Sequence, residues 1–225
     1  MKKLLIISGL VLSNYIITIE QIYQSPEYDT FVISNPKAVK NIFREFAGIE
    51  TKRILLRKIE EQDAEAMFNL ASHPEVIKHT AALELVKTKE DAVALINLMM
   101  QRYEIDLPTR WAMVDKASNM VIGICGFVAY NSSFCRGEIG YALNYEYWGK
   151  GFATEATQAV IQFGFEHMNL NRIEATVDPD NHGSIHVIEK VGMKFEGILR
   201  QHIWSKGAFR DRKMYALLKN EHNHN

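Results

Sequence analysis

The sequence predicts an α/β or α+β fold built around one sheet. Two observations carry this prediction: short apolar runs typical of strands alternate with amphipathic stretches typical of helices, and no segment repeats along the chain. The 225 residues are 47% hydrophobic and 24% charged, which excludes a disordered or collagen-like chain. A chain of this length can bury a substantial core.

The first fifty residues are expected to be an extension of the main domain. Met1-Lys2-Lys3 and the apolar stretch 4–19 have the charged start and apolar centre of a signal peptide, but no small-x-small cleavage pattern follows. The stretch is shorter than the ~20 apolar residues that a spanning helix needs, and polar residues interrupt it. We favour a buried strand or helix here. A membrane anchor and a misplaced start of the chain are the alternatives.

An amphipathic helix is predicted over about residues 36–47. Asn35 can cap it, Pro36 suits its first position, and Gly48 suits its end. One stripe is apolar at helical spacing, formed by Val39, Ile42, Phe43 and Phe46.

From Arg53 onward, strands and helices follow one another closely. Strands are expected at residues 54–57, 111–114, 121–124, 138–143, 172–177, 193–196 and 214–218, and helices from 64 to before Pro74, from 89 to about 99, over 154–167 and over 181–191. Thr88 and Asp91 have the spacing of a capping box, and Gly192 marks a helix end. Residues 221–225 are expected to be a frayed polar tail.

Charge and cysteine content narrow the functional classes. The net charge of −1 and the pI near 6.7 leave no basic surplus to hold a polyanion, so nucleic-acid binding is not expected. Cys125 and Cys135 form no CxxC pair and indicate reduced thiols of a cytoplasmic protein, with a single disulfide as the alternative. His182 and His186 have metal-ligand spacing on a helix, but no convincing third ligand follows, so no metal is expected.

The most informative segment runs from a strand through a glycine-bearing loop into a helix, between Glu138 and Ala156. Gly149 and Gly151 precede a helix N-terminus, where unpaired N–H groups and the helix dipole favour an anion. Two glycines alone are typical of many tight turns. The dinucleotide-binding pattern is not matched, because Thr154 stands at its third glycine position, and the Walker pattern is absent.

Three segments in order along the chain strengthen the anion-site interpretation. They read YWGKGFATEA (147–156), NHGSIHVIEKVGM (181–193) and, at the end, Asp211 followed by MYAL (214–217). Together they resemble the GNAT N-acetyltransferases of the RimJ/RimL-like branch, the ribosomal-protein-alanine and amine acetyltransferase type. Trp148 departs from the Gln or Arg of the general motif. The resemblance covers residues 53–218 and implies an acetyltransferase domain at 51–220, with a mostly antiparallel sheet splayed after its fourth strand and flanked by helices.

The resemblance also implies acetyl-CoA as the acetyl donor, with no metal. The pantetheine arm is expected alongside Tyr141, Ala142 and Leu143 like an added strand, with Asn181 holding it by side-chain hydrogen bonds. The pyrophosphate is expected at the loop and first helical turn. These residues are Trp148, which sets the loop angle, Gly149, Lys150, Gly151, Phe152, Ala153 and Thr154. Glu155 is expected to have a structural role at the helix start.

Two residues match the catalytic positions of the family. Glu138 corresponds to a carboxylate that deprotonates the amine through water; its alternative is a solvated residue or a partner of Arg136. Ser184 corresponds to the residue near the CoA sulfur and is the candidate acid; its alternative is a serine satisfying its own helix N-terminus. Tyr141 is interpreted as a packing residue that could aid either step.

The expected activity is direct transfer of an acetyl group to a primary amine in a ternary complex. The acceptor is expected to be a protein N-terminus or a small amine, in a cleft built from residues around 77–85 and 202–210. A non-catalytic acetyl-CoA-binding sensor or interaction module is the alternative. Whether the chain forms a homodimer is left open.

Overall fold

The computed structural model describes residues 39–80, 83 and 86–222, which lie within one compact unit, Asn35–Asn225. Its strands are β1 (Ile49–Glu50), β2 (Ile54–Arg57), β3 (Arg110–Asp115), β4 (Met120–Asn131), β5 (Arg136–Leu143), β6 (Arg172–Val177), β7 (Lys194–Ser205) and β8 (Ala208–Leu218). Its helices are α2 (Ala64–Ser72), α3 (Pro74–Lys78), α4 (Lys89–Glu104), α5 (Phe152–His167), α6 (His182–Lys190) and α7 (Lys219–His222), with 3₁₀ turns η1 (Glu61–Asp63) and η3 (Tyr145–Tyr147).

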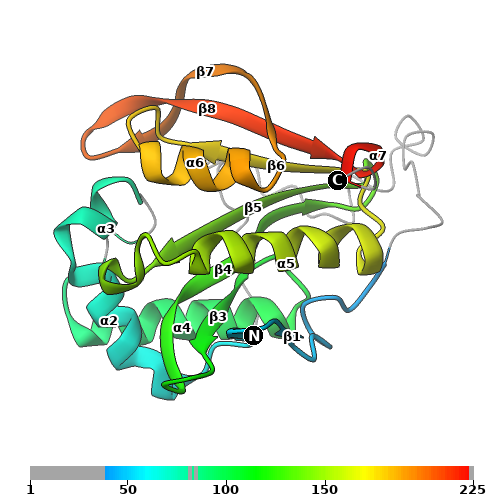
Figure 1. Ribbon diagram of the computed structural model, residues 1–225. Coiled ribbons are helices and arrows are strands. Elements are labelled where there is room, and N and C mark those ends of the chain that lie inside the picture. Colours follow the sequence, from blue (N-terminus) through cyan, green and yellow to red (C-terminus); the bar gives the residue numbers. More distant parts are fainter. Residues whose placement is uncertain (1–38, 81–82, 84–85, 223–225) are drawn as a thin grey trace, which may run out of the picture. The chain divides into compact units, whose positions relative to one another are not determined.

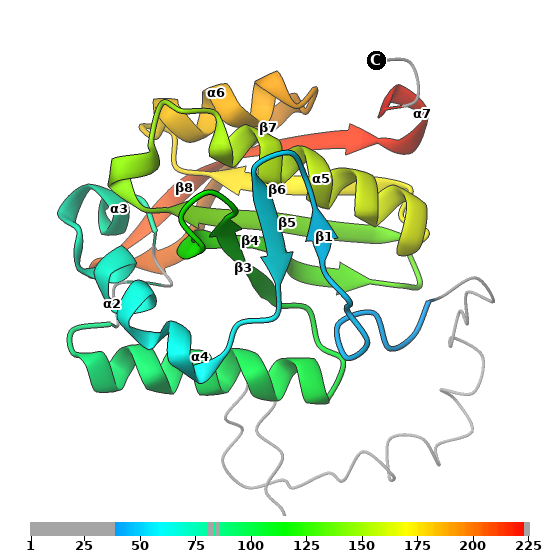
Figure 2. The same ribbon diagram turned by 60° about the horizontal axis from the view of Figure 1, so that its bottom comes forward.

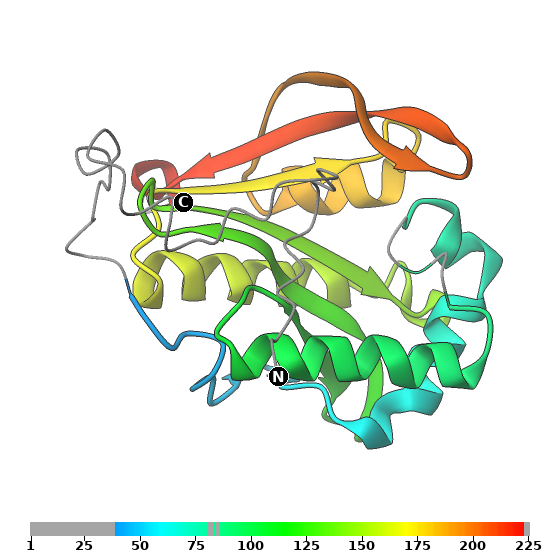
Figure 3. The same ribbon diagram turned by 180° about the vertical axis from the view of Figure 1, so that it is seen from behind.

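The eight strands described form one sheet in the order β1-β2-β3-β4-β5-β6-β8-β7. Figure 1 shows α5 and α6 lying across one face of this sheet, and Figure 3, seen from behind, shows α4 on the opposite face. Figure 2 shows the hairpin of β1 and β2, in blue, in front of α5. The predicted class, a mixed and mostly antiparallel sheet flanked by helices, is confirmed.

The sheet opens between β5 and β6, its one parallel pair among the described strands. The ladder joins Arg136 to Arg172, Gly137 to Ile173 and Glu138 to Glu174, and no residue beyond Glu138 takes part. Both strands continue past this pair, and in Figure 1 they diverge toward the side where α3 lies. This is the splay expected after the fourth predicted strand. That strand is β5 here because the two-residue β1 was not predicted.

Local sequence signals place the helices that border this opening. The hydroxyl of Thr88 accepts a hydrogen bond from the Asp91 amide at 3.1 Å, and the Asp91 carboxylate accepts one from the Thr88 amide at 2.8 Å. The capping box that starts α4 is thereby confirmed. α6 ends before Gly192, which has φ +89° and so suits the left-handed end of a helix.

The predicted helix at 36–47 is wrong for the residues that the structure describes, because 41–45 form a turn. Asn41 has φ 59°, which breaks a right-handed helix. The carboxylate of Asp106 then occupies the turn by accepting from three backbone amides, those of Asn41, Phe43 and Arg44. A side chain from a distant loop has replaced the helical hydrogen bonds.

The apolar stripe of this segment nevertheless reaches the core. Ile42, Phe43 and Phe46 are buried, and the Phe46 ring stacks on that of Trp111 with centroids 3.9 Å apart. Residues 39–50 are therefore part of the packed unit that contains the sheet, since β1 also pairs with β2. The predictions for residues 4–19 lie outside the described residues.

Three further differences from the prediction concern chain ends and turns. Pro74 starts α3 rather than only ending α2, because proline suits the first helical position. β7 and β8 form a hairpin much longer than the predicted strands, closed at Lys206-Gly207. Glu221 and His222 belong to α7 instead of a frayed tail, with Glu221 bonded to Lys194 at 2.5 Å. No helix within the described ranges has the length and apolar character to cross a membrane.

Candidate acetyl-donor and amine site

The glycine-bearing loop reaches α5 through two left-handed residues. Gly149 has φ +71° and Gly151 has φ +81°, a conformation that L side chains rarely adopt. Gly151 is the N-cap of α5 and offers no side-chain cap, so the amides of the first turn are left to an anion. A Cβ on Gly149 would meet nothing within 4 Å. The glycines are therefore required by backbone conformation, and the space over the loop is open.

The Glu155 carboxylate and the Arg53 guanidinium hold this loop in place through hydrogen bonds. Glu155 accepts from the Thr51 hydroxyl at 2.7 Å, the Arg53 amide at 2.8 Å and Arg53 Nε at 2.7 Å. Arg53 also donates to the Lys150 carbonyl at 2.8 Å and lies over the Phe152 ring at 4.4 Å. Burial would raise the pKa of Glu155, but these hydrogen bonds outweigh it and keep the pKa below its usual value. The expected structural role of Glu155 is the one observed.

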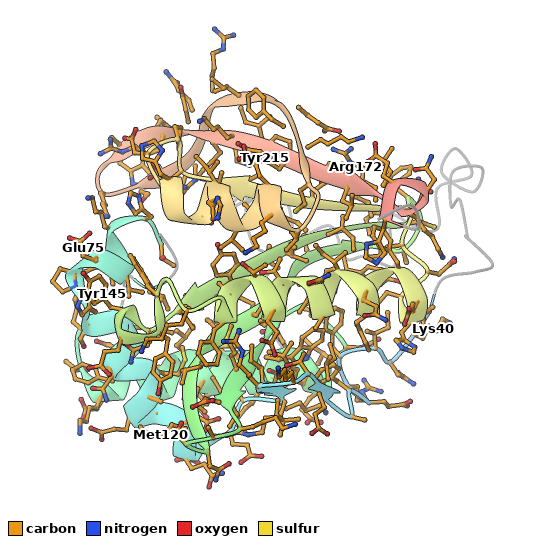
Figure 4. The ribbon with its side chains drawn as sticks, in the orientation of Figure 1. Lys40, Glu75, Met120, Tyr145, Arg172 and Tyr215 are labelled. Carbon is orange, nitrogen blue, oxygen red and sulfur yellow. The ribbon has the colours of Figure 1, made fainter. Side chains whose placement is uncertain are left out.

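Trp148 connects the loop to the end of β5. Its indole N–H donates to the Leu143 carbonyl at 2.8 Å, and its ring lies 5.1 Å from that of Tyr145. The ring of Tyr145, which Figure 4 labels, stacks on that of His73 with centroids 4.3 Å apart. His73 lies at the junction of α2 and α3. These contacts join Trp148 to the end of β5 and to Tyr145, and the residue is 41% exposed, so its role beside the donor stays a prediction.

The residues after Gly151 divide into buried side chains and available backbone. Phe152 and Ala153 are buried, so only their amides can face a ligand, whereas Thr154 is half-buried. The Lys150 ammonium lies 5.4 Å from the Tyr147 ring centre, on an exposed residue. An uncapped helix start beside an exposed lysine fits the pyrophosphate of a CoA thioester.

Beyond Glu138 the main chain of β5 has no partner in β6, which leaves an edge along which an extended ligand can add. Tyr141, Ala142 and Leu143 lie in this unpaired stretch and pair only with β4. The predicted strand-like position for the pantetheine arm therefore corresponds to a strand edge that the fold leaves open.

Ser184 faces Tyr141 across the opening. The Ser184 Oγ and Tyr141 Oη atoms are 2.9 Å apart, and the Ser184 amide donates to Asn181 Oδ1 at 3.0 Å. Asn181 is thus the N-cap of α6, and its side-chain oxygen is engaged there. The alternative that Ser184 satisfies its own helix does not hold, since Asn181 does this.

Glu138 lies at the last pair of the β5–β6 ladder. Its carboxylate accepts from the Thr176 hydroxyl at 2.8 Å, whereas the guanidinium of Arg136 lies 3.6 Å from the carboxylate of Glu174. Strand alternation puts Glu138 and Tyr141 on opposite faces of β5. A hollow of about 250 Å³ borders Glu138, lined also by Ala129, Tyr130, Asn131, Arg136, Gly137 and Glu174.

The two segments expected to build the acceptor cleft meet at one end of the opening. Lys206, in the β7–β8 turn, donates to the Lys78 carbonyl of α3 at 2.6 Å. Next to it, His79 Nδ1 and Arg212 Nη1 lie 3.4 Å and 3.8 Å from the Asp178 carboxylate. These contacts join α3, the end of β6 and β8.

Sequence reasoning missed the contacts that connect these residues. Nothing local indicates that Arg53 braces the loop or that Tyr141 meets Ser184, 43 positions away. Strand alternation is the one sequence signal that bears on these contacts, because it predicts that the side chains of Tyr141 and Glu138 lie on opposite faces of β5. In the described part of the chain, His, Cys, Asp and Glu side chains form no group of three that could hold a metal ion.

A larger hollow of about 790 Å³ lies between residues 39–51 and α5. Thr51 and Glu155 border it, but Glu138, Tyr141 and Ser184 do not. The residues expected to carry the chemistry thus lie at the opening between β5 and β6 and not at this hollow.

Comparison with known proteins identifies the same family that the sequence motifs resemble. The family described as Acetyltransferase (GNAT) domain matches residues 53–194. An N-acetyltransferase named p20 of Bacillus licheniformis, itself uncharacterized, is 38% identical over 174 residues, covering 76% of this chain and 96% of that protein. A GNAT-family acetyltransferase structure from Bacillus anthracis is 34% identical, with a TM-score of 0.68, covering 77% and 99% of the two chains. RimL, a ribosomal L7/L12 α-N-protein acetyltransferase in complex with coenzyme A, shares the fold at 19% identity, with a TM-score of 0.69 and coverage of 76% and 97%.

Proposed function

The chain belongs to the GNAT family and is an N-acetyltransferase, and from this premise we propose that it transfers the acetyl group of acetyl-CoA directly to a primary amine in a ternary complex. Acetyl-CoA, the donor used by this family, supplies an acetyl group activated as a thioester. Everything else required is a matter of binding, orientation and proton transfer by the residues of this chain.

We propose that the donor is held at three places. The first-turn amides of α5 and Lys150 bind its phosphates, the free edge of β5 at 141–143 binds its pantetheine arm, and the Asn181 amide group donates to that arm. The uncapped start of α5 and the ladder that stops at Glu138 support this assignment.

Glu138 is the proposed base, acting on the amine through water. A protonated amine cannot attack a carbonyl, so a carboxylate near the reacting carbon provides a route for its proton. The Thr176 hydroxyl orients the carboxylate, and the hollow beside it gives the amine and a water a way in.

Ser184 is the proposed acid, because a departing thiolate needs a proton. Its amide is already bound to Asn181, so its hydroxyl is not needed by the helix end. Strand alternation carries this proposal: the base lies on one face of the β5 edge and the acid on the other. An amine entering from the Glu138 face and a thiolate leaving toward Ser184 then flank the acyl carbon on opposite sides.

The acceptor is proposed to be a primary amine, either a protein N-terminus or a small amine. RimL is named for a protein N-terminus, but at 19% identity that likeness supports the fold alone. The segments around α3 and the β7–β8 turn, which meet through Lys206, are where the rest of the acceptor is proposed to lie.

Glu138→Gln tests the proposed base. At neutral pH we expect kcat/KM for the amine to fall by about 10²–10⁴-fold. The deficit should shrink as the pH rises toward the pKa of the amine, about 8 for an N-terminus and about 10 for an alkylamine, since free amine then forms without help. Steady-state rates of thiol release across pH measure this.

Glu174→Gln is the control, because this second carboxylate at the same hollow is bonded to Arg172 at 2.7 Å. It removes a negative charge from the same place without removing the proposed base. A Glu138→Gln rate equal to wild type at neutral pH, or equal to that of Glu174→Gln, would remove Glu138 from the role.

A further inference from the structure

We infer that Tyr141 is a positioning residue whose hydroxyl donates to Ser184 Oγ and thereby turns the serine's own proton into the opening between β5 and β6. This inference rests on the proposed role of Ser184 and adds to it a second residue that neither touches the amine nor replaces the acid.

The geometry places the two hydroxyl groups on either side of the opening. Tyr141 belongs to β5, three positions beyond the last residue that pairs with β6, and Ser184 belongs to the first turn of α6, which follows β6. Their oxygens are 2.9 Å apart, a normal hydrogen-bond distance between hydroxyl groups. The bond therefore joins β5 to the start of α6, beside the place where β5 and β6 have separated.

The direction of this hydrogen bond follows from the proposed role of Ser184 together with the number of protons available. Each hydroxyl has one proton to give and can accept from another group. If Ser184 donated to Tyr141, its single proton would be used and none would remain for a leaving group. If Tyr141 donates, Ser184 Oγ accepts and its own proton is free to point elsewhere. Only the second arrangement suits an acid.

Two neighbouring contacts favour the second arrangement. Asn181 Oδ1 accepts the Ser184 amide, so the serine hydroxyl has no duty at the helix end. Burial raises the pKa of Tyr141 well above its usual value, although the bond to Ser184 opposes this, so the phenol keeps its proton at neutral pH.

The proton balance of the step is simple. Once Glu138 has passed the proton of the ammonium group to solvent, the neutral amine forms its N–C bond and gives a second proton toward Glu138. The C–S bond of the thioester breaks, the Ser184 O–H bond breaks with it, and an S–H bond forms on the leaving sulfur. Tyr141 keeps its own proton and donates a hydrogen bond to the oxygen that is losing one, which stabilises the charge there. Solvent then takes the proton from Glu138 and returns one to Ser184.

The test is a double-mutant cycle with Tyr141→Phe, Ser184→Ala and both together. Tyr141→Phe should lower kcat by about 10- to 100-fold, the worth of one hydrogen bond to a charged oxygen, and leave KM for acetyl-CoA nearly unchanged. Because Tyr141 acts through Ser184, the double variant should be no slower than Ser184→Ala alone. Rates are measured as thiol release from acetyl-CoA with peptides bearing a free N-terminus and with aliphatic diamines. If the protein acetylates none of these amines, the rates of acetyl-CoA hydrolysis by water are compared in the same way between wild type and the three variants.

Tyr215→Phe is the matched control. Tyr215, which belongs to β8 and is labelled in Figure 4, also contacts α6. Its hydroxyl donates to the Glu189 carboxylate at 3.3 Å. It lies away from Ser184, so its loss tests whether any hydroxyl that anchors α6 matters. We expect kcat of Tyr215→Phe to be close to wild type.

The outcomes separate the inference from the proposed function. An unchanged kcat in Tyr141→Phe, a double variant slower than Ser184→Ala by the full Tyr141→Phe factor, or an equal loss in Tyr215→Phe overturns the positioning role. An unchanged kcat in Ser184→Ala instead refutes Ser184 as the acid, whatever Tyr141→Phe does.

Discussion

At the scale of single residues, the glycine-bearing loop depends on the conformation of Gly149 and Gly151. It also depends on Arg53, which contacts the Glu155 carboxylate and the Lys150 carbonyl. Gly151 adopts φ +81°, and a Cβ there would lie 3.4 Å from Arg53 Nη2, the guanidinium that also holds the Lys150 carbonyl. A side chain at this position would therefore disturb both the backbone of the loop and the group that supports it. The amides that follow Gly151 would then lose their arrangement.

Gly151→Val should abolish measurable binding of CoA in calorimetry. A left-handed conformation costs an L residue about 1–2 kcal/mol, and the new side chain also crowds Arg53. Gly207→Val is the control, because Gly207 has φ +73° in the β7–β8 turn with nothing within 4 Å of its Cβ position. It should lose comparable stability and keep CoA affinity. Wild-type affinity in Gly151→Val would sink the loop assignment.

At the scale of elements, Glu155 joins the first turn of α5 to the strand that enters the sheet at Ile54. Its carboxylate receives three hydrogen bonds from Thr51 and Arg53, which fix where α5 begins relative to β2. The elements that we propose to bind the donor are thus positioned by contacts between Glu155 of the glycine motif and two residues outside it, Thr51 and Arg53.

Glu155→Gln should lower the free energy of unfolding at pH 7 by about 1–2 kcal/mol, a modest figure because Arg53 is 39% exposed and partly screened. The folded-state pKa of Glu155 lies below the unfolded value of about 4.3, so its contribution is complete above that pH and is lost as the pH falls through the folded pKa. Urea unfolding at pH 7 and pH 3 should therefore show a difference from wild type that shrinks on acidification.

Glu166→Gln, an exposed carboxylate near the other end of α5, is the control for this experiment and should change stability little. An equal deficit for Glu155→Gln at both pH values would mean that the carboxylate's charge is not what joins the two elements.

An element could be predicted from the sequence where the contacts that form it join residues close together in the chain. The strand at 54–57, the capping box at Thr88 and the helix after Asn181 depend on neighbours within a few residues, and all three were identified from the sequence. The segment at 39–47 was not, because Asp106 supplies its hydrogen bonds from a different part of the chain. Its buried residues were still correct, since burial of Phe43 and Phe46 requires only an apolar pattern.

The same reasoning explains what could be predicted of the site. Motif residues in one stretch, such as Gly149 and Gly151, are visible in the sequence. The contact between Tyr141 and Ser184 depends on how far β5 and β6 separate, and that is a property of the sheet. The sequence therefore indicates only that Tyr141 packs, which it does against the core, whereas its hydrogen bond to Ser184 is visible in the structure alone.

At the scale of the whole molecule, the near-zero net charge agrees with the kind of anion binding that we propose. The net charge of −1 gives no general attraction for polyanions, and the glycine-bearing loop leads instead into a helix whose start has no side-chain cap. The sheet contributes the rest, because β5 and β6 separate after their third pair, Glu138 and Glu174, and leave an edge of β5 unpaired.

The most direct test of the account is two-substrate kinetics with purified protein, acetyl-CoA and a panel of primary amines. We predict that at least one amine gives thiol release equal to the amide formed, and that double-reciprocal plots at several fixed amine concentrations intersect, as direct transfer in a ternary complex requires. Parallel lines would indicate an acetylated protein intermediate. CoA that protects the protein against melting while no amine is acetylated would contradict the account and favour a non-catalytic binding module.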